Sequence, residues 1–261
     1  MVLHTITAEP APPECVPAWP AISATQLPRR DAYWLITQPD HAALSGALAA
    51  RFTSPEFPQL EPDVVRAIGL HDAGWAVFDA ETGGGAWPPL NEAGKPLAFF
   101  EIEPPEFLRA WTASIERAEQ VAPIGGMIVS RHFCWLGRFR LESRTDPPEI
   151  TAMLRQFLEH EAWRQQRLHE RDPRPECELQ RLTATLQFCD LLSLYLCCGT
   201  RASVEFPQPL ASKPIRLAWH DGGCVLQPSP FREGVSLGVM ARRFPPSASS
   251  PSTTSLGFLL S

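Results

Sequence analysis

Basic residues do not dominate this 261-residue chain, which has 23 Lys and Arg against 29 Asp and Glu and a net charge of −6. A protein that coats nucleic acid needs clustered Lys and Arg to contact phosphates, so the charge balance argues against that class. The sequence also has no run of about 18 apolar residues, the length that suggests a membrane-spanning helix. We therefore expect neither a nucleic-acid coat protein nor a membrane protein.

Zinc-ribbon and secretory signals are also missing. None of the seven cysteines belongs to a Cys-x-x-Cys pair. Their number is odd, and Cys189, Cys197 and Cys198 lie in an apolar stretch, so we expect free buried thiols. The N-terminus has no basic region followed by an apolar stretch, and no secretory signal is expected. These features predict a cytoplasmic protein.

Apolar periodicity predicts mostly helices. We expect a helix starting near Pro39 and further helices at 62–72, 106–121, 127–139, 149–171 and 179–198, with Gly199 ending the last. Short strands are expected at 33–37 and 235–240, with a hairpin formed by 215–219 and 224–227. The predicted fold is mainly α, a helical bundle with a small antiparallel β element near the C-terminus and a short N-terminal strand.

The length suggests one large domain or one domain with an appendage, and the sequence has no internal repeat. Residues 1–28 are rich in proline, which blocks helix interiors, and are predicted to form an irregular arm. A single helical domain is expected at 29–244, including the β element at about 213–241. Residues 245–261 resemble a flexible Pro/Ser-rich tail whose last apolar residues could dock on the body.

The clearest chemical signal is an acidic residue in an apolar setting. Asp190 lies in the middle of the most apolar predicted helix, where an ionised carboxylate is costly without a cation, a donor network or a proton. The alternative is that Asp190 pairs with an arginine or bonds to neighbouring backbone. His71 and Asp72 close another helix, and an adjacent imidazole and carboxylate can bind one divalent cation if more ligands arrive from elsewhere.

Two other histidines have open interpretations. His41 lies near the start of a helix, and it could ligate a metal or simply bond to a carboxylate there. His132 could act at the same site or fill a pocket between Phe133 and Trp135. The residues alone leave these alternatives open.

Four segments together carry a family resemblance, and they are Thr37–Ala42, His71–Trp75, Val129–His132 and Cys189–Cys197. A first His, then a His-Asp pair, then a late Asp on a long helix resembles the HD-domain superfamily of metal-dependent phosphohydrolases. The wider pattern, over about residues 30–240, resembles one uncharacterised branch, domain of unknown function 3891. The expected fold is therefore an HD-like helical bundle.

The resemblance implies that His41, His71, Asp72 and Asp190 bind one divalent metal ion. Two nitrogens and two carboxylates suit Fe, Mn, Ni, Zn or Mg without distinguishing among them. A second metal would need two further histidines between Asp72 and Asp190. Only His132 stands there in a matching motif, so a mononuclear site is expected.

The implied activity is hydrolysis of a phosphate ester, a nucleotide or another small phosphorylated molecule, by a metal-activated water. Asp72 would orient the water, and Arg131 and His132 would neutralise phosphate charge. The candidate substrate pocket comprises Gln38, Trp75, Trp87 and Tyr195. Its aromatic residues could instead pack in the core.

The alternative function is a catalytically inactive protein that keeps the fold and binds a metal or senses a small ligand. The absence of a second histidine pair motivates this alternative. The sequence leaves a homodimer open.

Overall fold

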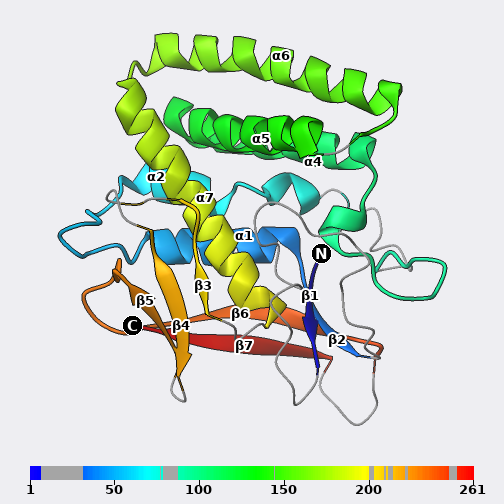
Figure 1. Ribbon diagram of the computed structural model, residues 1–261, viewed down its shortest axis with the longest axis vertical. Helices are drawn as coiled ribbons and strands as arrows, with labels where there is room; N and C mark the ends of the chain where they lie inside the picture. Colours follow the sequence, from blue (N-terminus) through cyan, green and yellow to red (C-terminus); the bar gives the residue numbers. More distant parts are fainter. Residues whose placement is uncertain are drawn as a thin grey trace.

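The computed structural model describes residues 1–6, 32–76, 78, 88–143, 145–199, 203–208, 210, 214–220, 223–246 and 252–261. It is 54% helical, but 19% of it is strand, gathered in a seven-stranded mixed sheet that curls. The expectation of a mainly-α bundle with a small β element is therefore wrong. The protein combines a helical part with a full sheet (Figure 1).

The sheet joins both ends of the chain. Its strand order is β1-β2-β6-β7-β5-β4-β3, and all neighbours are antiparallel except β5 and β7. The strands are β1 (Val2–Thr5), β2 (Tyr33–Ile36), β3 (Val204–Glu205), β4 (Arg216–His220), β5 (Gly223–Gln227), β6 (Val235–Phe244) and β7 (Thr253–Leu260).

Two strands lie in segments that the sequence indicated as irregular. Val2–Thr5, from the expected arm, forms β1 beside β2, while residues 7–28 of that arm lie outside the described residues. Thr253–Leu260, from the expected tail, pairs with β6 along its length, from Val235↔Leu260 to Arg242↔Thr253. Leu256 and Phe258 pack against the core, while Ser255, Gly257 and Leu259, which alternate with them, are exposed. This alternation is what stabilises a strand with one buried face.

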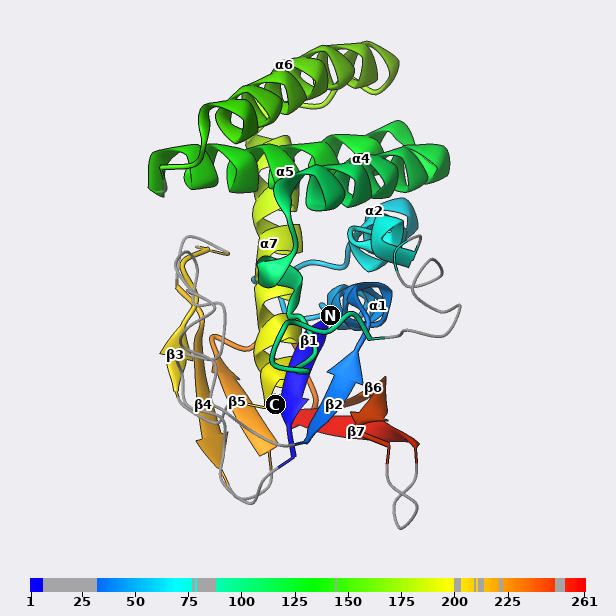
Figure 2. The same cartoon turned by 90° about the vertical axis from the view of Figure 1, so that its right-hand side faces the viewer.

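The helices form layers on the sheet, as Figures 1 and 2 show. α1 lies next to the sheet, α2 above it, then α4 with α5, and α6 is outermost. α7 crosses these layers and reaches the sheet, so its middle is surrounded on all sides, which explains its apolar sequence. The helices are α1 (Gln38–Ala49), α2 (Pro62–Gly69), α4 (Pro104–Val121), α5 (Pro123–Ser143), α6 (Pro148–Arg171) and α7 (Glu176–Cys198), with short 3-10 turns η3 (Ala73–Trp75) and η4 (Phe99–Glu101).

The structure confirms the predicted start of the first helix and the predicted end of the last one. Thr37 caps α1, because its hydroxyl accepts from the Asp40 N–H at 3.1 Å, and Pro39 lies in the first turn. α7 ends at Gly199, whose φ of 75° suits a glycine cap. In the described part of the chain, no helix is long and apolar enough to cross a membrane.

A buried charge network joins α6 to α4. The Glu161 side chain is fully buried and accepts from Arg164 Nε at 3.1 Å, and Arg164 Nη1 donates to Glu119 at 3.1 Å. Replacing Arg164 with methionine should lower the free energy of unfolding by about 3 kcal/mol, since Glu161 would lose its buried partner. Denaturant unfolding measures this cost.

Arg167→Met is the matched control for that variant. Arg167 also contacts Glu119, at 3.0 Å, but its side chain is 57% exposed. An exposed ion pair contributes about 1 kcal/mol at most. If both variants lost the same unfolding free energy, the stabilisation by Arg164 would not come from its contact with the buried Glu161.

Candidate metal centre

Three potential metal ligands converge in the interior from three different elements. His41 comes from α1, His71 follows the end of α2, and Asp190 lies in the middle of α7. The Nε2 atoms of both histidines lie 3.1 Å from Asp190 Oδ1. One ligand atom from each of the three residues lies within 4.8 Å of the others, and all three residues are buried.

The backbone orients both imidazole rings in the same way. His41 Nδ1 lies 2.7 Å from the carbonyl oxygen of Gln38, and His71 Nδ1 lies 2.8 Å from that of Ile68. A carbonyl oxygen can only accept, so Nδ1 carries the hydrogen in each ring. Nε2 is therefore the atom that each ring directs at Asp190. A backbone acceptor on the far nitrogen is the usual way in which a protein orients a histidine ligand.

The charges in this cluster favour a cation between the groups. Burial by itself lowers the pKa of His71, but the nearby carboxylates of Asp190 and Asp72 raise it to about 9. Burial by itself raises the pKa of Asp190, but His71 and the hydrogen bonds from both histidines hold it well below its usual range. Positive charge is thus stabilised where the two Nε2 atoms face the carboxylate.

Asp72 lies beside the three convergent residues. Its Oδ2 is 3.7 Å from His41 Nε2 and 3.8 Å from His71 Nε2, while its Oδ1 accepts from Trp75 Nε1 at 3.2 Å. Burial raises the pKa of Asp72, and the two histidines oppose that rise. Trp75 is buried, and its indole N–H orients this carboxylate.

The distances suit a divalent metal ion. Two ligands that lie about 2.1 Å from an ion and at right angles to each other are about 3.0 Å apart. The two separations of 3.1 Å to Asp190 match this value, and the Asp72 oxygen lies slightly farther out. The set of two imidazoles and two carboxylates is one that Zn, Mn, Fe or Ni would accept. These residues could hold one ion after small shifts of Asp72.

His132 lies at the edge of the cluster. Its Nε2 is 3.7 Å from Asp190 Oδ2, and its ring meets that of His71 edge-to-face at 5.7 Å. Burial, together with the nearby histidines, lowers the pKa of His132 to about 4, although Asp190 opposes this. Burial therefore favours the neutral imidazole of His132 beside Asp190.

Arg131 does not join the cluster, although it precedes His132. Its guanidinium donates two hydrogen bonds to Glu176, at 3.1 and 2.6 Å. Glu176 lies in the first turn of α7, roughly 20 Å of helix before Asp190. Consecutive residues on a helix point about 100° apart, so Arg131 and His132 are directed to different places although they are adjacent in sequence.

The other candidate pocket residues do not form one wall around the cluster. Gln38 is buried at the start of α1, with no hydrogen-bond partner for its Oε1. Tyr195 is five residues after Asp190, so it lies on another side of α7, where its ring packs 6.3 Å from that of Phe206. Trp87 lies outside the described residues.

Two glycines position the histidines, and sequence reasoning missed them. Gly46 of α1 meets Gly69 of α2, and a Cβ built on Gly46 would lie 2.7 Å from Gly69 Cα. This close crossing brings the rings of His41 and His71 to 5.2 Å between centroids. The available signal was a glycine inside each of two predicted helices, where glycine is otherwise unfavourable.

Ser114 is a second residue that the sequence did not single out. Its hydroxyl accepts from the Gly74 N–H at 2.9 Å and donates to the Ala110 carbonyl at 2.9 Å. Gly74 lies so close to the α4 backbone that a Cβ there would overlap the Ala110 oxygen. The turn that carries Asp72 is therefore fixed against α4.

Comparison with known proteins identifies a family and no activity. The family model described as "Protein of unknown function (DUF3891)" matches residues 27–245, which include every residue of the candidate metal centre. No curated protein matches the chain, and no solved structure matches it.

Proposed function

The chain belongs to the DUF3891 family of proteins of unknown function, and on this premise we propose that it is a metal-dependent hydrolase of HD-domain type. Its substrate class would be a small phosphate ester, a nucleotide or another phosphorylated molecule. One observation carries the proposal: His41, His71 and Asp190 converge from three elements, with both Nε2 atoms oriented toward the carboxylate. A buried carboxylate between two oriented imidazoles is costly to maintain unless positive charge is held there.

In this proposal His41, His71 and Asp190 hold one divalent ion, and Asp72 completes the set. The ion, when bound, lowers the pKa of a water and polarises a phosphoryl oxygen. Trp75 holds Asp72 Oδ1, which leaves Oδ2 directed at the histidines and able to orient the attacking water. His132 Nε2 lies 3.7 Å from Asp190 Oδ2, so this ring would contact the water or substrate at the edge of the set.

A second candidate is a metal-binding sensor or scaffold without catalysis. Two observations favour it. Arg131 is engaged by Glu176 instead of lying at the cluster. The side chains of Asp72 and Asp190 are only 10% and 7% exposed, and those of His41 and His71 are 0% and 1% exposed. A substrate phosphate would need more room than these values give, unless the site opens.

Elemental analysis of the purified chain and a hydrolysis screen separate the two candidates. We expect about one equivalent of a divalent metal, and turnover of at least one nucleotide or generic phosphate ester that a chelator abolishes and added metal restores. Metal without turnover across a broad panel would support the sensor. Failure to bind any metal under any loading condition would contradict both.

The state of the cysteines supports a reducing compartment, and we propose the cytoplasm. The six cysteines within the described residues are free, and five of them are buried. Burial raises the pKa of the Cys134 and Cys224 thiols to about 11, so these thiols are unreactive at neutral pH. Free thiols of this kind are typical of proteins kept under reducing conditions.

A further inference from the structure

An exposed tryptophan stands out on the outermost helix. Trp163 of α6 is 73% exposed, whereas the other exposed large apolar residues of the described chain, Leu90, Met240 and Leu259, are 48–54% exposed. α6 has no layer of the molecule outside it (Figures 1 and 2). Tryptophan is the residue type most enriched at the energetic centres of protein interfaces.

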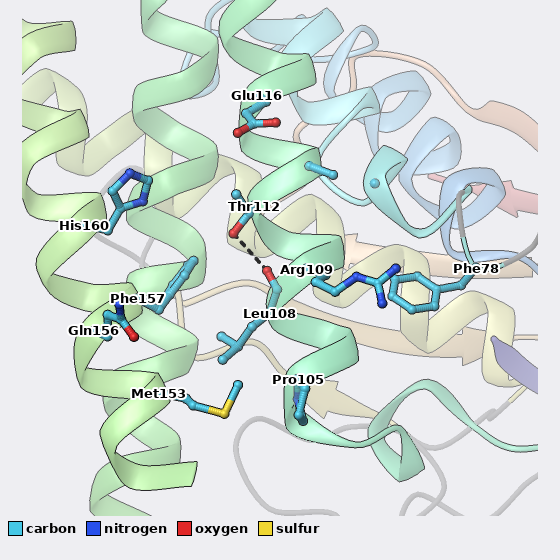
Figure 3. Close-up of a pocket in the computed structure, with 12 residues that line it drawn as sticks. Phe78, Pro105, Leu108, Arg109, Thr112, Glu116, Met153, Gln156, Phe157 and His160 are labelled. Carbon is cyan, nitrogen blue, oxygen red and sulfur yellow. Dashed lines mark hydrogen bonds between the residues drawn. The ribbon is translucent and has the colours of Figure 1, made fainter. Parts of the chain in front are cut away.

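A pocket lies between α4 and α6 (Figure 3). Its volume is about 560 Å³. Apolar side chains supply much of its lining, and they are Phe78, Leu108, Met153 and Phe157. The polar rim includes Arg109, Glu116, Gln156 and His160. Arg109 extends over the ring of Phe78, with its guanidinium carbon 5.1 Å from the ring centroid.

The chemistry of this pocket suits an indole ring. Apolar walls accept the faces of the ring, and a guanidinium at the rim can lie over it. The indole N–H needs an acceptor when it is buried, and the Glu116 carboxylate offers one. The pocket therefore has a partner group for each part of a tryptophan side chain.

The position of Trp163 relative to the pocket is what a symmetric dimer requires. Gln156, His160 and Trp163 are spaced i, i+4 and i+7, so they follow one stripe of α6. The pocket residues of α6 centre on 156–157, about 10 Å along the helix from Trp163. A two-fold axis near His160 exchanges these two positions. Each tryptophan would then meet the pocket of the other copy, as in an isologous interface.

We propose that α6 forms a homodimer interface in which Trp163 of each copy occupies the α4–α6 pocket of the other. Antiparallel pairing about His160 places the N-terminal end of each α6 beside the C-terminal end of the other, so the helix dipoles oppose each other favourably.

Analytical ultracentrifugation of the full chain tests the dimer. We expect a dimer for the wild type, and a dimer Kd raised about 1000-fold by Trp163→Ala, because each copy loses one interface hot spot and each loss costs about 30-fold. Ala113→Phe fills the pocket, which Ala113 lines, and should give a monomer as well. Met240→Ala is the matched control, since Met240 is an exposed apolar residue on strand β6 and should leave the dimer intact.

Mixing the two monomeric variants provides a test that misfolding cannot imitate. Trp163→Ala keeps its pocket and Ala113→Phe keeps its tryptophan, so the mixture should form a heterodimer with one of the two contacts. Thermal melts of the separate variants check that both are folded. A wild type that stays monomeric up to about 100 µM, a range that detects a micromolar Kd, overturns the proposal. A dimer that survives Trp163→Ala overturns it too.

Discussion

His71→Ala is expected to lower the affinity for a divalent metal by more than about 100-fold, because loss of groups that merely orient a ligand already costs 10–100-fold. The variant removes one of the three convergent ligand atoms and leaves His41 and Asp190 facing each other at 3.1 Å. The remaining residues, His41, Asp190 and the more distant Asp72, offer only one imidazole nitrogen to the ion. Metal content after dialysis, together with a competition titration against a chelator, measures the change.

Two further variants keep this result interpretable. His71→Asn retains a polar group at the position and checks that loss of metal does not come from a collapsed site. His169→Ala removes an exposed histidine from the last turn of α6 and should bind metal as the wild type does. Far-UV circular dichroism should be similar for all three. If folded His71→Ala retains its metal, the assigned ligand set is wrong.

The residues that converge in the candidate metal centre could be singled out because each lies in a local context that the sequence displays. Asp190 stands out in an apolar helix, His71 and Asp72 are adjacent, and His41 follows the capping residue of α1. Helix boundaries were predictable for the same reason, since caps and periodicity act over a few residues. Even so, the cost of burying the Asp190 carboxylate did not by itself show which groups would offset that cost. Asp190 is compensated by two imidazoles before any metal is considered.

Arrangements that depend on distant partners were not predictable. β1 pairs with β2 across a long intervening segment, and β7 pairs with β6, the strand that precedes it; short segments of mixed composition display neither pairing. Arg131 neighbours His132 in sequence, but Glu176, 45 residues away, holds its side chain elsewhere. The position of the Arg131 side chain therefore depends on a residue that its local sequence does not display.

The second large effect is expected from a residue that contacts no ligand. Gly46→Ala puts a methyl group 2.7 Å from Gly69 Cα and 2.9 Å from Gly69 N, both of which are backbone atoms. Overpacking typically costs 1–3 kcal/mol, which exceeds the roughly 1 kcal/mol that alanine gains over glycine in a helix. We expect a net loss of up to about 2 kcal/mol in unfolding free energy. Metal affinity should fall as well, because separating α1 from α2 moves His41 away from His71.

Gly69→Ala is the matched control, because the crossing is not symmetric. A Cβ on Gly69 would lie 3.6 Å from Gly46 Cα and 4.0 Å from the Ala42 oxygen, which are ordinary contacts. That variant should keep wild-type metal affinity and equal or exceed wild-type stability, since alanine favours the helix. Denaturant unfolding and metal titration of Gly46→Ala and Gly69→Ala measure the difference in stability and in metal affinity. If the two alanines behave alike, the close approach of α1 and α2 is not what fixes the distance between the two imidazoles.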